Sequence, residues 1–218
     1  MTNNLLDEDQ RIKIASEAEK LLDEQDLSQN KWVLISKILM NENIELKEGD
    51  FRDISGMLIK GQDSKWTIFI NKEDSANRKL FTIAHELGHY KLHAAESLKF
   101  IDGQLGEQYW NRDEGTKYQK FEIEANEFAA NLLMPRKVIE KELGDMAGKK
   151  INQEHILTLA NKMGVSTLAM LTRLKNLDYV DGDRTASRRF NTTNDGKCFS
   201  SSIYLLYRSF GGRESGNS

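Results

Sequence analysis

Residues 81–93, FTIAHELGHYKLH, hold three of the chain's four histidines around one glutamate. His85 and His89 are four residues apart, so on a helix both imidazoles lie on one face and can reach the same ion. Glu86 directly follows His85, and from there it can reach a water molecule beside the ion without binding the ion itself. This H-E-x-x-H arrangement is the pattern of zinc peptidases. The stretch predicts a helix with two zinc ligands and a general base.

A purely structural histidine pair is the alternative to a metal site. With four histidines in the chain, an accidental match has a probability below roughly one in a hundred, which favours zinc. Gly88 agrees with this interpretation. Inside a helix it costs about 1 kcal/mol relative to alanine, but its single hydrogen lets a second backbone pack closely.

His93 lies eight residues beyond His85. Eight residues of straight helix span about 12 Å, whereas ligand nitrogens lie about 2.1 Å from one zinc ion. His93 is therefore not a third ligand beside the other two, and a metzincin-type third histidine is excluded because position 95 is Ala95. Two interpretations stay open for His93: a packing or surface histidine, or a group that supports a ligand or donates to the transition state.

The third ligand is expected from residues 120–135, KFEIEANEFAANLLMP, whose apolar stripe predicts a helix packed in the core. Glu122 and Glu124 flank this stripe about 200° apart around the helix, so we expect one of them to face the metal. We favour Glu122, because Asn126 stands one turn further on and can hold a ligand histidine through its other ring nitrogen. Glu124 is the alternative. Pro135, the only proline, ends the helix.

The other elements follow from periodicity and composition. Helices are expected over residues 7–26, 31–40, 79–96 and 118–133, and two more around a turn at Gly164. Residues 54–59 and 66–70 are short, β-branched and aromatic, so we expect two antiparallel strands. The second of them is expected to form a sheet edge that receives an extended substrate. The expected fold class is α+β: a mainly helical core with a small antiparallel sheet, followed by a helix-turn-helix-like segment.

Composition places the chain among soluble proteins of the cytoplasm. The net charge of −3 gives no global sign of nucleic-acid binding. One cysteine excludes an intrachain disulfide, the N-terminus is acidic, and no apolar run approaches the ~20 residues of a membrane span. We expect a peptidase core over 1–148, a helix-turn-helix-like segment over 149–180, and a polar tail of unassigned role over 181–218. The tail is expected to be dispensable for the zinc site.

The combination of FTIAHELGHYKLH and EIEANEFAANLLMP resembles the ImmA/IrrE family of zinc metallopeptidases. SGMLI and WTIFIN before the first motif, and VSTLAMLTRLKNL after the second, resemble the flanks of that family, so the likeness covers about residues 10–178. The resemblance implies a gluzincin-like fold with His85, His89 and Glu122 as zinc ligands and Glu86 as general base. It also implies selective cleavage of a partner protein, a helix-turn-helix repressor of a mobile element or stress response.

Two other functions compete with this one. The first is DNA binding by residues 149–180, which contain the Ala160, Gly164 and Val165 pattern of a helix-turn-helix. We do not expect it, because the second helix begins with Ser166 and Thr167 and has no early Arg, Asn or Gln to read base edges. The second is a non-hydrolytic regulatory protein that keeps zinc, against which Glu86 argues. The oxyanion donor stays open among His93, Tyr90, Tyr109, Tyr118 and His155.

Overall fold

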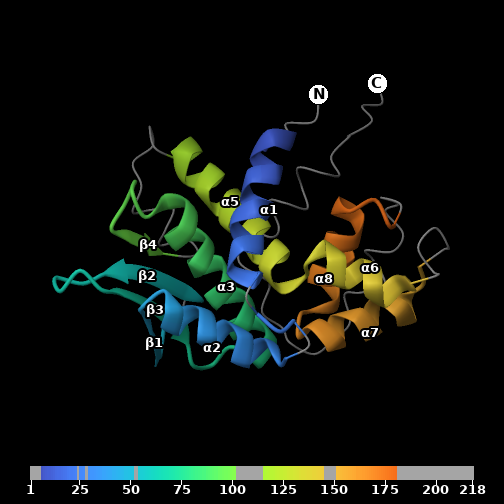
Figure 1. The fold of residues 1–218 in the computed structure, drawn as a ribbon. Coiled ribbons are helices and arrows are strands. Elements are labelled where there is room, and N and C mark those ends of the chain that lie inside the picture. The colour runs from blue at the N-terminus through green and yellow to red at the C-terminus, as the bar shows by residue number, and fades with distance from the viewer. Residues whose placement is uncertain are drawn as a thin grey trace, which may run out of the picture.

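The computed structural model describes residues 6–23, 25–27, 29–51, 54–101, 115–144 and 151–180. Its helices are α1 (Glu8–Leu22), α2 (Lys31–Asn41), α3 (Ala76–His93), α5 (Gly115–Leu133), α6 (Arg136–Leu143), α7 (Gln153–Met163) and α8 (Thr167–Asn176). Its strands are β1 (Ile44–Gly49), β2 (Gly56–Lys60), β3 (Trp66–Asn71) and β4 (Lys99–Ile101). Figure 1 shows a small sheet beside a larger set of helices, which confirms the mainly helical α+β class. The expected tail and Tyr109 lie outside the described residues.

The sheet is mixed, with strand order β1-β3-β2-β4. β2 runs antiparallel to both β3 and β4, whereas β1 runs parallel to β3. The antiparallel pair was predicted, but the expectation that residues 66–70 form a sheet edge was wrong, because β1 covers that side of β3. In β1, IELKEG, only Ile44 is buried, so its charged side chains hide the alternation that identifies a strand.

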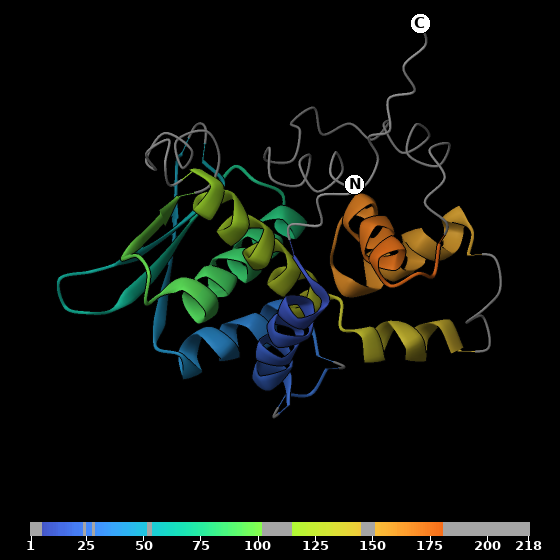
Figure 2. The ribbon, with the colours of Figure 1, turned by 90° about the horizontal axis from the view of Figure 1, so that it is seen from above.

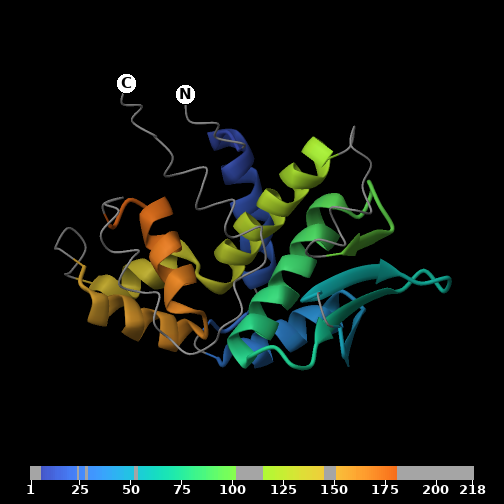
Figure 3. The ribbon, with the colours of Figure 1, turned by 180° about the vertical axis from the view of Figure 1, so that it is seen from behind.

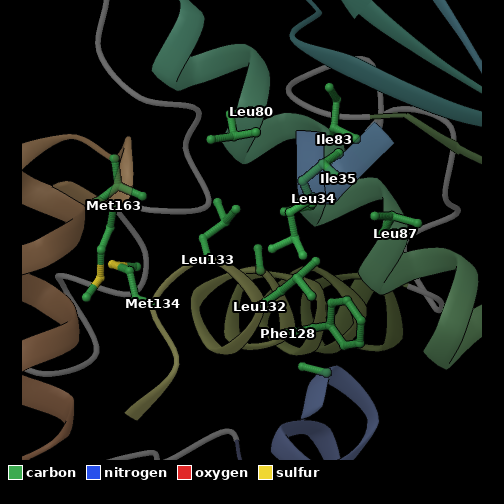
Figure 4. Packing of buried hydrophobic residues seen from close by; sticks show 14 of the residues in the cluster. Leu34, Ile35, Leu80, Ile83, Leu87, Phe128, Leu132, Leu133, Met134 and Met163 are labelled. Atoms are coloured by element: carbon green, nitrogen blue, oxygen red, sulfur yellow. The ribbon is translucent and has the colours of Figure 1, made fainter. Parts of the chain in front are cut away.

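The core lies between the sheet and two long helices. α3 packs against β2 and β3, and α5 runs along α3 on the side away from the sheet (Figures 1 and 3). Alternate residues of β3 are buried on this face, as its period of two requires. Figure 4 shows the cluster that α2, α3 and α5 share: Leu34, Ile35, Leu80, Ile83, Leu87, Phe128 and Leu132. The described helices include none that is both long and apolar enough to cross a membrane.

Local signals set several helix ends. α5 stops at Leu133, and Pro135 then takes an extended conformation (φ −59°, ψ 135°) as the N-cap of α6, which confirms its predicted role as a helix end. Gly164 closes α7 in the left-handed region (φ 66°), where glycine has no side chain to clash. The predicted turn between two helices is therefore present at that residue.

α6, α7 and α8 form a cluster at the end of α5 far from the sheet (Figure 2). The apolar residues Met170, Leu171 and Leu174 of α8 are buried in the hydrophobic cluster that includes α3 and α5. Met163 of α7 and Met134 after α5 belong to the same cluster (Figure 4).

A buried ionic network ties α8 to α5 and α1. Arg173 is 3% exposed and donates to the Met134 carbonyl (3.2 Å), to Asn131 Oδ1 (2.7 Å) and to Glu127 Oε1 (3.4 Å). The other carboxylate oxygen of Glu127 accepts from Arg11 on α1 at 3.4 Å. Burial lowers the pKa of Arg173, and the charge of Glu127 opposes that shift. The network therefore holds α8 against α5 through polar contacts, in addition to the apolar contacts around it.

We predict that Arg173→Ala lowers the free energy of unfolding by about 3 kcal/mol, because the buried Glu127 carboxylate loses one of its two arginine partners. Urea denaturation of the full chain measures this. Arg136→Ala is the matched control, since Arg136 pairs with Glu140 at the surface, and it should change the unfolding midpoint little. Equal midpoints for the two variants would contradict the structural role of the network.

Candidate metal centre

The site depends on a very close approach of α3 and α5 at Gly88. A Cβ placed on Gly88 would lie 2.9 Å from the Cα and 3.0 Å from the carbonyl oxygen of Ala125, and 3.2 Å from Cβ of Phe128. These are backbone or near-backbone atoms, which cannot swing away as the end of a long side chain can. The two backbones are therefore in direct contact here, as the glycine in the sequence predicted.

This contact brings two imidazoles of α3 against one carboxylate of α5. Nε2 of His85 lies 3.0 Å from Nε2 of His89. The Glu122 carboxylate lies 3.5 Å from the first nitrogen and 3.1 Å from the second. All three residues are buried, and their ligand atoms lie within 4.8 Å of one another.

Contacts at the outer ring nitrogens turn the inner ones toward the centre. Nδ1 of His85 lies 3.1 Å from Oδ1 of Asn126. An amide oxygen can only accept a hydrogen bond, so His85 carries its proton on Nδ1 and keeps a lone pair on Nε2. Asn126 therefore stands where the sequence suggested, behind a histidine of the pair.

Charge at the centre agrees with this arrangement. Burial lowers the pKa of His89 to about 4, although the hydrogen bond and charge of Glu122 oppose the shift. Burial raises the pKa of the Glu122 carboxyl, but hydrogen bonds to His85 and His89 lower it by more. The pKa therefore lies below its usual value, and the carboxylate stays ionised. At neutral pH an anionic carboxylate thus faces a neutral His89 in a buried space.

This set of donors fits a metal ion. Two imidazole nitrogens and an ionised carboxylate lie within 4.8 Å of one another in a buried space, an arrangement that a cation between them would stabilise. Two ligand atoms bound tetrahedrally at about 2.1 Å are roughly 3.4 Å apart. The observed separations of 3.0, 3.1 and 3.5 Å are close to that value. His85, His89 and Glu122 can therefore hold one ion with little movement.

Glu86 directly follows His85 on α3, and β2 begins against its side chain. Its side chain is 0% exposed. A Cβ on Gly56, the first residue of β2, would lie 2.6 Å from Oε1 of Glu86 and 2.4 Å from Cγ2 of Thr82. No sequence pattern indicated this role for Gly56, because Glu86, its neighbour in space, is some thirty residues away in the chain.

His93 and Glu124 meet just beyond the ligand atoms. His93 is 2% exposed, and its Nδ1 lies 3.1 Å from Nδ1 of His89. Its Nε2 lies 2.8 Å from Oε2 of Glu124. Of the two carboxylates considered as the third ligand, Glu122 therefore faces both His85 and His89, and Glu124 contacts His93.

The other residues considered as oxyanion donors have different contacts. The Tyr118 hydroxyl donates to the Ile101 carbonyl at 3.1 Å. The Tyr90 ring packs edge-on against Trp66. His155 joins Asn152 in the capping box at the start of α7. These contacts direct the three residues toward structural partners.

Two aromatic rings that the sequence did not mark also border the site. Phe100 of β4 stacks on His89 with ring centroids 4.6 Å apart, and Phe121 of α5 stacks on His93 at 4.2 Å. β4 is three residues long, too short for a periodic signal. Phe121 was recognised only as part of an apolar stripe.

We predict that Gly88→Ala weakens metal binding and lowers the unfolding midpoint, because its methyl group pushes α3 away from the α5 backbone. Overpacking of about 1–3 kcal/mol exceeds or offsets the gain of about 1 kcal/mol in helix propensity. Calorimetric titration with metal and urea denaturation measure the two effects.

Gly61→Ala is the control, because the nearest atom to its new Cβ is the mobile Asp63 Oδ1, at 2.7 Å. It should bind metal like the parent protein. A Gly88→Ala variant with unchanged metal affinity would show that the close helix contact is not needed for the site.

Comparison with known proteins agrees with this geometry. A family model described as Peptidase M78, IrrE N-terminal-like domain, matches residues 39–175, from the end of α2 to the end of α8. No curated protein gives a significant match to the chain. The matched region is more than half of the chain and contains all three residues of the His-His-Glu group. The chain therefore belongs to the IrrE N-terminal-like family of M78 peptidases, the family that its two motifs resemble.

Proposed function

We propose that this protein is a zinc-dependent endopeptidase that cleaves one partner protein selectively, a helix-turn-helix transcriptional repressor. The observation that carries the hydrolytic part is the buried triangle of two imidazole nitrogens and one carboxylate, with Glu86 next to His85 in sequence. The peptidase family supports the same reaction class.

Zinc is the metal we propose, because two imidazoles and one carboxylate are the ligand set of catalytic zinc sites that keep an open position. His85, His89 and Glu122 would hold the ion. When bound, zinc supplies Lewis acidity that lowers the pKa of water toward about 7 and polarises a carbonyl group.

Glu86 is the proposed general base. Its carboxylate accepts a proton from the attacking water and delivers it to the amine that leaves when the peptide bond breaks. Burial of Glu86 at 0% exposure keeps bulk water from competing for that proton. Gly56 leaves the space that the carboxylate occupies, so any side chain at that position would displace the base.

Selectivity is proposed from the burial of the site and from the family resemblance. His85 and Glu122 expose only 4% and 5%, and Glu86 and His89 expose nothing. A protease for any unfolded chain needs an open cleft, whereas a buried site favours a substrate that is presented in one arrangement. Members of the family that the motifs resemble cleave repressors, and this is the basis for the proposed substrate class.

The structural surroundings of α8 argue against direct DNA binding. The side chain of Ser166 accepts from the Ala169 amide as an N-cap, and Arg173 is buried. Neither residue is placed to contact a base edge or a phosphate group. The alternative of a regulator without hydrolytic activity differs from the proposal in that it does not require Glu86.

We predict one zinc ion per chain. Glu122→Ala should lose this zinc, whereas Glu124→Ala should still bind one zinc ion per chain. Glu122 is the carboxylate near His85 and His89, and its removal leaves two ligands. Metal analysis after gel filtration measures the content. Full zinc in Glu122→Ala together with loss in Glu124→Ala would reverse the assignment of the third ligand.

We predict that Glu86→Gln keeps zinc but slows cleavage by about 10²–10⁴-fold, the usual contribution of a general base. The protein is co-expressed with the repressor encoded beside its gene, and mass spectrometry identifies the fragments. Casein under equal zinc is the control substrate, and it should be cut slowly by the parent protein.

Two results would contradict the proposal. Casein hydrolysis as fast as repressor cleavage would indicate an unselective peptidase. Relief of repression that survives Glu86→Gln would favour the non-hydrolytic alternative.

A further inference from the structure

His93 has contacts at both ring nitrogens and on its ring face. Both ring nitrogens have polar partners, His89 at 3.1 Å and Glu124 at 2.8 Å. The ring face stacks on Phe121 with an interplanar angle of 25°. A packing histidine needs only the stacking contact, so the two polar contacts call for a separate explanation.

Glu124 decides which nitrogen of His93 carries the proton. A carboxylate only accepts hydrogen bonds, so Nε2 of His93 is the donor in that contact. With a single ring proton, Nδ1 of His93 is then an acceptor, and Nδ1 of His89 must donate to it. His89 consequently keeps a lone pair on Nε2, the atom 3.0 Å from Nε2 of His85 and 3.1 Å from Glu122.

We propose that Glu124 and His93 are positioning residues for His89: a carboxylate–imidazole pair that sets its tautomer and ring orientation so that Nε2 faces the metal. This rests on the metal centre of the proposed function. It assigns Glu124 a part in the site although Glu124 is not a ligand. His93 stands between α3 and α5 as the link through which that carboxylate acts.

The two ligand histidines are thereby supported in different ways. His85 is held directly by the neutral amide of Asn126, whereas His89 is held through His93 by a carboxylate that bears charge. Hydrogen bonds to a carboxylate raise the basicity of a ligand imidazole and restrict its rotation. His89 should therefore be the stronger of the two imidazole ligands.

The experiment measures zinc affinity in the full chain carrying Glu86→Gln, by competition with a chromophoric chelator, so that no proteolysis interferes. Glu124→Met removes the acceptor at similar volume, and Glu124→Gln keeps an acceptor oxygen without the charge. His93→Phe keeps the stacking on Phe121 but cannot link Glu124 to His89. Lys120→Met is the matched control, one turn away on α5, where the lysine lies 3.8 Å from Glu124.

We expect the zinc dissociation constant to rise about 10–100-fold in Glu124→Met and His93→Phe, as for other residues that support metal ligands. Glu124→Gln should lose less, and Lys120→Met should stay within about twofold of the parent. Parent-like affinity in both Glu124→Met and His93→Phe would overturn the proposal.

A second measurement does not depend on whether the variants fold. Nitrogen-15 NMR of the metal-free parent protein reports which ring nitrogen of each histidine carries the proton. The proposal requires Nδ1–H on His89 and Nε2–H on His93, and the opposite tautomers would overturn it. A parent protein that folds with these tautomers but binds no zinc would refute the metal centre itself, while the proton arrangement would stand.

Discussion

The contact between the backbones of α3 and α5 at Gly88 is the constraint on which the rest of the structure depends. Without a side chain at that position, the two helices come close enough for residues one turn away to share a space of a few ångströms. The histidines of α3 and Glu122 of α5 meet only because of this distance. Hydrophobic packing of Leu87 and Phe128 beside the contact holds the helices together and excludes water from the polar centre.

Excluding water makes the centre chemically demanding. An ionised carboxylate and two imidazole lone pairs that face one another are unfavourable in a buried space, and a bound cation relieves this. The same burial strengthens every electrostatic interaction with that cation. Burial of these polar atoms therefore has two consequences. It favours a bound metal ion, and it restricts the access of substrates to the site.

α5 connects this centre to the rest of the protein. Glu122, Glu124 and Asn126, near its middle, contact the three histidines of α3. Glu127 and Asn131, closer to its end, bind the buried Arg173 of α8. The helix-turn-helix-like pair is thus anchored to the same helix as the site, with Arg173 and the buried apolar residues of α8 turned into the core.

The sequence by itself determined the features that depend on local spacing. The four-residue interval between His85 and His89, the end of α5 before Pro135 and the turn at Gly164 are properties of neighbouring residues, and all three appear in the structure. The residue types at that interval also indicated the chemistry, since imidazole pairs and an adjacent carboxylate have few other uses. The family was recognisable from the same two stretches.

Only the tertiary structure decided how distant segments meet. Glu122 and Glu124 both flank the apolar stripe, and helical angles alone could not say which one faces His85 and His89, because that depends on where α3 crosses α5. Both carboxylates contact α3, since that helix continues to His93 and meets Glu124 there. β1 escaped detection because its side chains face water, and β3 became an interior strand as a result. Strand order and helix crossing arise from contacts between residues far apart in the chain, which no local pattern records.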